Sequence, residues 1–578
     1  MESLKYSEII KQNSILAKEL VGNSLYRIKI LSNVTCNQLK DVLAHNLMKS
    51  NINPDIQIGN YDNIIQDSYN CTSFQLVIIH YDLLNVIEKD NQFIEDYTDD
   101  QINALYQSII SDIDQILINL KLLPTVVFDT FSASSIYQNA VCSLKVERLV
   151  KQLNEYLYSK KETILNLNIL DINITLTRVG IANAFDFRMY YLSKTLYSIT
   201  FWKEYVYELS TIIYKYTGKI KKAIIFDCDN TLWKGILGED GISGIDMSLE
   251  SKVGQIFNKI QQIAVWLSKQ GVIIGLCSKN NSSDVDQVLN EHTDMILKKD
   301  YIVVSKVNWQ DKASNLKEIA KELNIGLDSF VFVDDSPFEV SLIEEQLPDV
   351  LTLLVPKSIQ EYPAQFLTLI ERNFYFSGTI SDIEKTKQYK AQFERLENMS
   401  KHKSLDDYLS SLNMEIKIIE DDITQIPRIS QLTQKTNQFN LTTQRYTENQ
   451  IQQFMNNEND FVFSVSVKDK FGESGLSAIC IIHGDNETAI IDSLLMSCRI
   501  MGRNIEYAFL SFIIDTLKEK GYKVLNASWI MTNKNVPVKE FYDMSGFLPV
   551  KIADDIKLYT LTISDYKRSQ IDYIKINN

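Results

Sequence analysis

The stretch KKAIIFDCDNTLW (221–233) decides the fold of the sequence around it. Two lysines lead into an apolar run, residues 223–226, which stops at Asp227 and Asp229. A short apolar run between polar residues is typical of a buried strand in an α/β sheet. Ligands of such sheets bind just beyond the carboxyl ends of the strands, and buried carboxylates without a partner are costly. We therefore expect Asp227 and Asp229 to lie at a functional edge of a sheet.

The sequence from 219 to about 365 repeats this pattern. Further apolar runs of strand length alternate with helical patterns, and the runs are VIIGLC (272–277), YIVVS (301–305), SFVFV (329–333) and VLTLLV (350–355). Regular alternation of strand and helix predicts a parallel, doubly wound α/β sheet. A glycine-rich loop, KGILGEDGISG (234–244), and one helical stripe ended by Gly271 separate the first two runs. This short insertion predicts a small flap and an open cleft.

The flanking segments differ from this middle domain. Residues 1–218 contain strand-like runs at 25–31, 74–80 and 125–129 between helical patterns, which predicts a first α/β domain. Its histidines, His45 and His80, lie in no triad-like motif, which favours a non-catalytic role. Residues 366–408 are charged and helical in pattern and are predicted to be a connector. Residues 409–578 have longer strands and one central helix near 503–520, which predicts a separate α+β domain.

The composition limits the location and the partners. The formal net charge of −15 argues against a nucleic-acid partner. Seven cysteines without a C-x-x-C pair are typical of a reduced cytoplasmic protein. The amino-terminal sequence lacks the features of a signal peptide, and no run approaches the roughly 20 apolar residues that span a bilayer. We therefore expect a cytoplasmic protein without a membrane partner.

Four groups of polar residues follow the strands of the middle domain or open its helices. They are Asp227 with Asp229, Ser278, Lys312, and Asp334 with Asp335. Parallel strands share one carboxyl edge, so these groups can converge there. Carboxylates bind Mg²⁺, hydroxyl and ammonium groups bind phosphate oxygens, and a carboxylate can attack phosphorus. The pattern predicts phosphoryl transfer.

In these motifs the sequence resembles the haloacid dehalogenase (HAD) phosphotransferase superfamily. The matching segments are DCDNT (227–231), CSKN (277–280), NWQDKASN (308–315) and FVDDSPFE (332–339). The resemblance implies that Asp227 is the phosphoryl nucleophile and Asp229 the general acid/base. It also implies that Mg²⁺ is held by Asp227, the carbonyl of Asp229, Asp334 and Asp335. The implied phosphate-binding residues are Thr231, Ser278, Lys279, Asn280 and Lys312.

The sequence also resembles the FkbH-like subgroup of that superfamily (subfamily IIIC) over a longer segment, DCDNTLWKGILGEDG (227–241). Two segments near the carboxyl end resemble the same subgroup, SCRIMGRNIE (497–506) and TNKNVPVKEFYDMSGF (532–547). This resemblance implies a HAD-like domain flanked by an SGNH-like domain and a GNAT-like domain. Members with a cysteine between the two acids are glyceryl transferase/phosphatases. They dephosphorylate 1,3-bisphosphoglycerate and load its glyceryl group onto the phosphopantetheine thiol of an acyl carrier protein in polyketide-type biosynthesis. The resemblance implies the same reaction here, with Cys228 carrying the acyl group as a thioester.

The residues themselves leave alternatives open. Side chains alternate along a strand, so Cys228 should point away from Asp227 and Asp229 unless the backbone turns, and a buried thiol is usually inert. The second candidate thiol is Cys498, which with Arg499 and Gly502 forms a possible pantetheine or acyl site. There Asn504 replaces the small residue of the GNAT phosphate-binding loop, which argues against ordinary coenzyme A binding.

Two other functions fit the same sequence. One is a HAD phosphatase of a small or sugar phosphate with an inert cysteine, and the other is a GNAT-type acyltransferase or scaffold. The basic cluster KYTGKIKK (215–222) is either a solvated linker or a docking patch for an acidic carrier protein.

Overall fold

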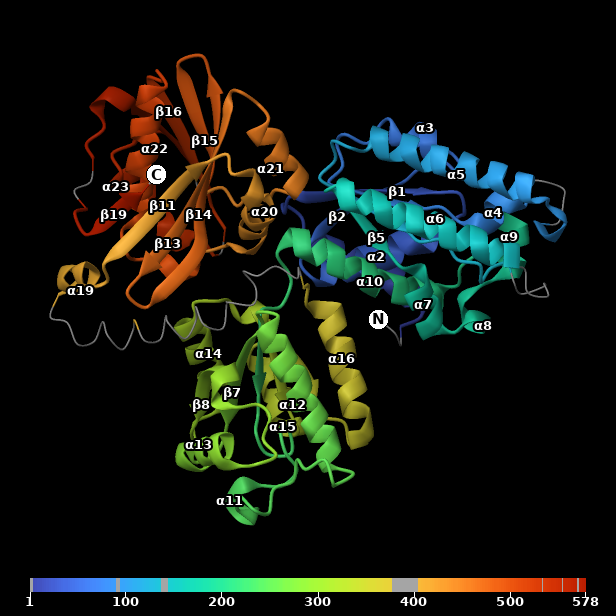
Figure 1. Ribbon diagram of the computed structural model, residues 1–578, viewed down its shortest axis with the longest axis horizontal. Coiled ribbons are helices and arrows are strands. Elements are labelled where there is room, and N and C mark those ends of the chain that lie inside the picture. The colour runs from blue at the N-terminus through green and yellow to red at the C-terminus, as the bar shows by residue number, and fades with distance from the viewer. Residues whose placement is uncertain are drawn as a thin grey trace. The chain divides into compact units, whose positions relative to one another are not determined.

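The computed structural model of the 578-residue chain describes residues 4–89, 94–136, 144–376, 395, 404–532, 534–553, 555–568 and 571–577 (Figure 1). The chain forms two compact units, residues 1–216 with 446–453, and residues 217–445 with 454–578. Among the described helices, none combines the length and the apolar character needed to cross a bilayer.

The first unit contains a five-stranded sheet in the order β2-β1-β3-β4-β5, with every pair parallel. Its strands are β1 (Leu25–Ser32), β2 (Asn53–Ile58), β3 (Leu76–His80), β4 (Thr125–Asp129) and β5 (Leu167–Leu170). Alternate side chains of the central strands enter two apolar clusters, one on each face of the sheet. The helices are α1 (Tyr6–Glu19), α2 (Asn37–Lys49), α3 (Ile64–Ser68), α4 (Leu83–Ile87), α5 (Asp99–Asn119), α6 (Leu144–Thr163), α7 (Ile172–Val179), α8 (Ile181–Ala184), α9 (Phe187–Ser193) and α10 (Ile199–Thr217).

The second unit begins with the predicted middle sheet, in the order β10-β9-β6-β7-β8 and again entirely parallel. The strands are β6 (Ala223–Phe226), β7 (Ile273–Ser278), β8 (Ile302–Val307), β9 (Phe330–Asp334) and β10 (Leu351–Leu354). The helices are α11 (Leu237–Asp240), α12 (Gly254–Lys269), α13 (Ser282–Glu291), α14 (Lys312–Leu323), α15 (Pro337–Gln346) and α16 (Tyr362–Asn373). The predicted doubly wound sheet is confirmed.

The central strand β6 explains why this sheet is stable. Ile224 and Phe226 pack with α12 and α16 on one face, whereas Ala223 and Ile225 pack with α14 and α15 on the other. A strand buried on both faces must be apolar throughout, which is the pattern of residues 223–226. The first polar side chain after this run is therefore at the carboxyl edge of the sheet.

The rest of the second unit is the predicted α+β domain. Its sheet has the order β17-β18-β16-β15-β14-β13-β11-β19, and β12 pairs with β15. The strands are β11 (Met414–Glu420), β12 (Phe439–Asn440), β13 (Asp460–Asp469), β14 (Gly472–Asp485), β15 (Thr488–Met496), β16 (Val524–Ile530), β17 (Leu548–Ile552), β18 (Ile556–Thr562) and β19 (Ile574–Asn577). The helices are α19 (Leu405–Ser411), α20 (Ile426–Lys435), α22 (Ile505–Glu519) and α23 (Phe541–Met544). Helix α21 (Glu448–Met455) lies mostly within the segment 446–453, which belongs to the first unit.

The predicted helical connector at 366–408 falls mostly outside the described residues. Helix α16 ends at Asn373 and α19 begins at Leu405. Of the residues 377–403, the structure describes Arg395 alone.

Candidate active site

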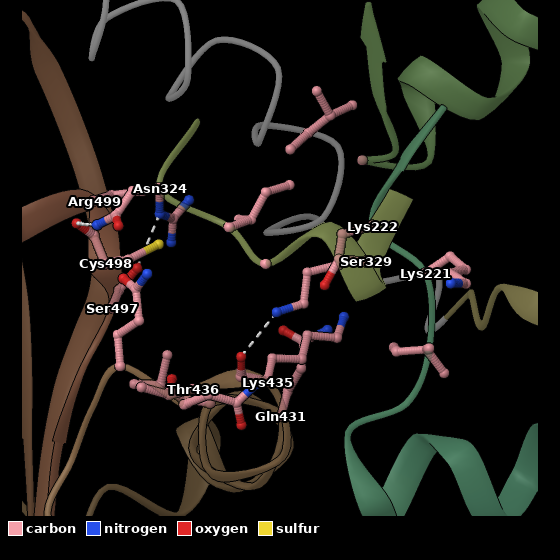
Figure 2. A pocket seen from close by; sticks show the side chains of 18 of the residues that line it. Lys221, Lys222, Asn324, Ser329, Gln431, Lys435, Thr436, Ser497, Cys498 and Arg499 are labelled. Carbon is pink, nitrogen blue, oxygen red and sulfur yellow. Dashed lines mark hydrogen bonds between the residues drawn. The ribbon is translucent and has the colours of Figure 1, made fainter. Parts of the chain in front are cut away.

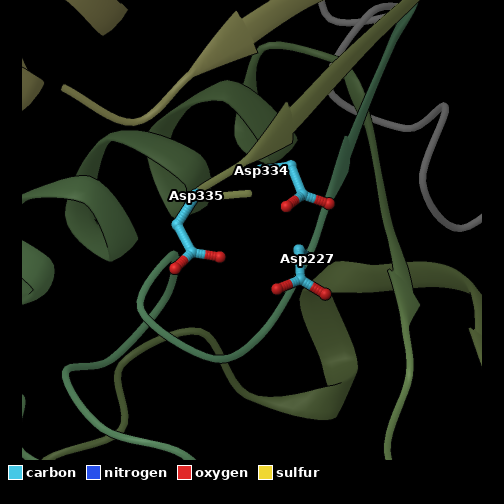
Figure 3. A group of neighbouring side chains, drawn as sticks. All are labelled: Asp227, Asp334 and Asp335. Carbon is cyan, nitrogen blue, oxygen red and sulfur yellow. The ribbon is translucent and has the colours of Figure 1, made fainter. Parts of the chain in front are cut away.

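Three carboxylates meet at the carboxyl edge of the middle sheet (Figure 3). Asp227 follows β6, and Asp334 and Asp335 stand at the end of β9. The two strands are paired with Phe226 opposite Val333, and the Asp227 amide donates to the Val333 carbonyl at 2.9 Å. One oxygen of each carboxylate lies within 4.8 Å of the others. Asp227 is 5% exposed and Asp334 is 0% exposed, so their mutual repulsion is poorly screened by water.

Lys312 supplies the counter-charge to this cluster. Its Nζ atom donates to Asp227 Oδ1 at 2.8 Å and to Asp334 Oδ2 at 2.6 Å. Lys312 is the first residue of α14, and the Asp311 carboxylate caps that helix by accepting from the Ser314 amide. The cap fixes where the helix begins and thereby places the buried ammonium at the sheet edge.

The pKa values of this cluster reflect both burial and charge. Burial raises the pKa of Asp227 to about 6, although Lys312 opposes the shift. Burial likewise raises the pKa of Asp334 and of Asp335, and the nearby Asp227 adds to the shift of Asp335. Burial disfavours the charged form of Lys312, but the two carboxylates outweigh it and raise its pKa. A further cation at this site would favour the ionised form of all three acids.

The Asp229 side chain points to a different set of partners. Its Oδ1 atom accepts from the Trp233 indole at 2.9 Å and from the Leu237 amide at 3.0 Å, and its Oδ2 atom accepts from Asn280 Nδ2 at 2.9 Å. Leu237 belongs to the flap at 234–244, which contains α11, and Trp233 directly precedes that flap. The flap therefore holds the Asp229 carboxylate beside, and not inside, the three-carboxylate cluster.

The predicted phosphate-binding residues are partly brought together. Ser278 ends β7, is buried, and lowers the pKa of Asp227 through a hydrogen bond. Asn280 Nδ2 also donates to Ser278 Oγ at 3.3 Å. Lys279 instead forms an ion pair with Glu339 at 2.6 Å. Thr231 is buried, and its hydroxyl has no hydrogen-bond partner among the described residues.

Cys228 is packed in the core. It is 0% exposed and belongs to the same apolar cluster as Leu232 and Trp233. Burial, reinforced by the charge of Asp227, raises its pKa far above that of a free thiol. The amides of Thr231 and Leu232 both donate to the Cys228 carbonyl, so the chain turns only after this residue. The thiol therefore continues the alternation of β6 on the side of Ile224 and Phe226, where a hydrogen bond with Ser278 partly opposes the effect of burial on its pKa.

The other candidate thiol site lies apart from this cluster. Cys498 and Arg499 form a 3-10 turn after β15, and the Cys498 carbonyl accepts from Asn324 Nδ2 at 3.3 Å. Cys498 is partly exposed and Arg499 is buried, with its Nε atom donating to Ser497 Oγ at 3.1 Å. Gly502 is exposed and has a positive φ of 74°. The structure does not bring these residues to the carboxylates.

The sequence reasoning missed the groups that orient Asp229 and Lys279. Trp233 and Leu237 hold Asp229, and Glu339 holds Lys279. A signal was present for Trp233, because an indole four residues after an acid that starts a turn is well placed to donate to it. None was present for Glu339, since its contact depends on how the first turn of α15 packs beside the loop that follows β7.

Comparison with known proteins supports the fold. Neither a protein-family model nor a curated protein matches the sequence. The solved N-terminal part of the protein BF1531 from Bacteroides fragilis, which contains a phosphatase domain complexed with Mg, is 23% identical. The alignment covers 65% of this chain and 100% of that chain, with a TM-score of 0.57. The likeness shows a shared fold, and the predicted doubly wound α/β fold class is confirmed.

Acetyltransferase structures also align with smaller parts of the chain. The ribosomal-protein-S18-alanine N-acetyltransferase from Escherichia coli is 16% identical over 27% of this chain and 99% of its own, with a TM-score of 0.22. An N-acetyltransferase from Staphylococcus aureus Mu50 is 17% identical over 26% of this chain and 99% of its own, with a TM-score of 0.20. No conclusion about activity rests on these two likenesses.

Proposed function

We propose that this protein catalyses metal-dependent phosphoryl transfer from an organic phosphate, with Asp227 as the nucleophile. The observation that carries the proposal is the buried ammonium of Lys312, which contacts both Asp227 and Asp334 beside the third carboxylate, Asp335. Such a cluster is costly to build and has no role in packing the sheet. It provides an anionic nucleophile and a cation for the phosphate oxygens in one place.

The donor set fits Mg²⁺. Three carboxylate oxygens within 4.8 Å of one another suit a hard cation that prefers oxygen ligands and keeps several waters. Asp227, Asp334 and Asp335 would hold the ion, and the solved Bacteroides fragilis protein contains Mg. When bound, Mg²⁺ offsets the negative charge of the phosphate and of the carboxylates.

The residues divide the reaction between them. An Asp227 oxygen attacks phosphorus, the bond from phosphorus to the leaving oxygen breaks, and that oxygen takes a proton from Asp229. Asp229 then takes a proton from a water molecule, which attacks the aspartyl phosphate, releases phosphate and regenerates Asp227. Lys312, Ser278 and Asn280 stabilise the phosphate oxygens throughout. Since the flap holds the Asp229 carboxylate, its proton is delivered from a fixed position.

The more specific proposal is glyceryl transfer. In it the substrate is 1,3-bisphosphoglycerate and the acceptor is the phosphopantetheine thiol of an acyl carrier protein. The FkbH-like motif at 227–241 and the small flap, in which α11 has four residues, support it. The burial of Cys228 favours a second candidate, a phosphatase of a small or sugar phosphate in which that thiol is inert.

Two measurements test these proposals. We expect the Asp227→Asn protein to lose phosphate release from p-nitrophenyl phosphate by about 10³-fold or more, and chelation of Mg²⁺ to abolish it reversibly. Asp284→Asn, at a partly exposed position in the first turn of α13, is the matched control. Retained activity in Asp227→Asn would refute the phosphoryl-transfer proposal.

Intact-mass spectrometry with 1,3-bisphosphoglycerate separates the two finer candidates, because only the glyceryl reaction gives an acyl adduct that Cys228→Ala lacks.

A further inference from the structure

Two exposed aromatic side chains lie close in sequence to residues of the candidate active site. Trp309 is 72% exposed and precedes Lys312 by three residues, and Phe338 is 69% exposed and follows Asp335 by three. Among the described residues, Phe338 is the one exposed phenylalanine, and the other exposed tryptophan is Trp266, at 44%. Single exposed apolar side chains are common on protein surfaces and need no explanation. Two large rings beside one cluster of functional groups are a surface suited to a ligand of that cluster.

The fold places both rings at the carboxyl edge of the middle sheet. Trp309 lies in the loop between β8 and α14, and Phe338 is the second residue of α15, which follows β9. In a parallel sheet, connections that lead from a strand to the next helix all lie at the carboxyl edge. Helices α14 and α15 cover the same face of the sheet and contact each other. The two rings therefore come from the beginnings of adjacent elements.

The Trp309 ring is fixed against the loop 278–281, which follows β7. Its Nε1 atom donates to Asn281 Oδ1 at 3.2 Å. The preceding residue, Asn280, donates from Nδ2 to Asp229 Oδ2 at 2.9 Å. The indole nitrogen is thus held one residue from a side chain that contacts the proposed general acid, whereas most of the ring remains open to solvent.

The start of α15 is fixed by the same loop. Lys279 Nζ forms an ion pair with Glu339 at 2.6 Å, and the Glu339 amide donates to Ser336 Oγ, which caps the helix. Glu339 is buried, whereas Phe338, directly before it, is exposed. An anchored turn therefore presents the Phe338 ring, and both rings adjoin residues that contact the loop 278–281.

The organic part of a phosphate ester bound at the carboxylates has no other cavity within reach along the sheet. A cavity of about 590 Å³ lies at the amino ends of the same strands, where its lining includes Lys222 before β6 and Ser329 before β9 (Figure 2). Strand β6 has four residues, so roughly 13 Å of buried strand separate this cavity from the carboxylates. The organic part must lie along the edge that carries Trp309 and Phe338.

We propose that Trp309 and Phe338 determine substrate specificity by packing against the organic group of the substrate, and that this group contains a ring. The inference rests on the proposed phosphoryl transfer and deepens it by naming the substrate class, a phosphate monoester of an aryl or sugar group. Aromatic side chains provide large contact areas and pack well against other rings. A short chain covers little of two aromatic rings, so the inference favours the sugar phosphate of the second candidate over a glyceryl phosphate.

The activity test compares two esters that carry a ring, p-nitrophenyl phosphate and glucose 6-phosphate, with acetyl phosphate, which has none. We expect Trp309→Ala and Phe338→Ala each to raise the KM for p-nitrophenyl phosphate by about tenfold and to keep kcat within about twofold. The KM for acetyl phosphate should change by less than about twofold, because its organic group is too short to cover either ring. A matching rise in the KM for glucose 6-phosphate assigns the contact to sugar rings as well, and an unchanged one assigns it to aryl groups.

Two control variants separate ring contact from general damage. Trp309→Phe keeps an aromatic ring and should keep the KM for p-nitrophenyl phosphate within about threefold of the unaltered value. Trp266→Ala removes an exposed tryptophan near the end of α12, towards the amino ends of the strands, and should change none of these values. A KM for p-nitrophenyl phosphate that either Trp309→Ala or Phe338→Ala leaves unchanged would overturn the proposal. So would a rise in KM that acetyl phosphate shares, because it would show that the rings only support the loop.

Calorimetric titration with phenylphosphonate and Mg²⁺ distinguishes failure of this inference from failure of the proposed function, because this probe is not hydrolysed. Trp309→Ala should weaken the binding of phenylphosphonate by about tenfold and change that of methylphosphonate by less than about twofold. If the unaltered protein releases phosphate but binds phenylphosphonate no better than methylphosphonate, the ring contact is refuted and phosphoryl transfer stands. If it shows the expected binding but releases no phosphate from any of the three esters, phosphoryl transfer is refuted and the ring contact stands.

Discussion

Lys312 is the residue on which the carboxylate cluster depends. Its ammonium contacts Asp227 and Asp334, and all three side chains are buried. Removing one partner from a buried charge network leaves the remaining charges uncompensated, typically at a cost of about 3–5 kcal/mol. In this site the remaining charges are carboxylates that repel one another.

We therefore predict that Lys312→Met lowers kcat/KM for p-nitrophenyl phosphate by about 10²–10³-fold. It should also lower the melting temperature measured without metal. Mg²⁺ should then raise the melting temperature of the variant by more than it raises that of the unaltered protein. Lys317→Met, at an exposed position of the same helix, is the control. A variant that keeps full activity would show that the ammonium only compensates charge within the protein.

At this scale the sequence predicted proximity but not orientation. Asp227, Ser278 and Asp334 could be placed together because each ends a strand of one parallel sheet. The partners of Asp229 could not, because they depend on how the flap folds back over it. The alternation of side chains predicts that Cys228 points away from the acids unless the backbone turns, and the structure shows that its side chain is fully buried and hydrogen-bonded with Ser278.

Helix α22 contains an acid in an unfavourable environment. Glu506 lies in its first turn, where the helix dipole favours a negative charge. Burial nevertheless raises its pKa from 4.5 to about 7, and its Oε2 atom has no hydrogen-bond partner among the described residues. The folded state therefore holds this proton more tightly than the unfolded state does. The resulting stabilisation is complete below about pH 4.5 and is lost as the pH rises towards 7.

We predict that Glu506→Gln removes this pH dependence. At pH 8 the variant should be more stable than the unaltered protein by about 1–3 kcal/mol, and the difference should shrink as the pH falls to 5. Thermal unfolding at several pH values measures it. Glu519→Gln, at the exposed end of the same helix, should show no such trend. A difference that is the same at pH 5 and pH 8 would mean that Glu506 does not titrate in this range.

Elements were predictable where burial dictates composition. Strands β6, β7 and β9 are buried throughout, so each is an apolar run up to the polar residue that ends β7 and β9 and follows β6. Strand β2 lies at the edge of its sheet and has the sequence NPDIQI, in which a proline and polar residues hide the strand signal. Strand β12 has only two residues and exists because β15 pairs with it.

At the scale of the whole molecule, the groups assigned to phosphoryl transfer all lie in the second unit, and the first unit has a polar cluster of its own. Asp129 ends β4 and is 2% exposed. Its carboxylate accepts from His80 Nδ1 at 2.5 Å and from the Tyr205 hydroxyl at 2.8 Å. His80 Nε2 is buried without a hydrogen-bond partner among the described residues. Aromatic rings of Tyr197, Trp202 and Tyr205 surround this imidazole, which leaves it packed in the core.

We predict that Asp129→Asn destabilises the first unit without changing catalysis. The amide that replaces the carboxylate cannot accept both hydrogen bonds in the same way, so calorimetry should show a loss of about 2–4 kcal/mol in the unfolding of that unit. Phosphate release at 25 °C, where both units remain folded, should be unchanged because every proposed catalytic group lies in the other unit. Asp62→Asn removes the exposed ion pair with Lys89 and should cost less than about 1 kcal/mol. If Asp129→Asn instead lowers the turnover of the folded protein, the first unit takes part in catalysis and its role is not purely structural.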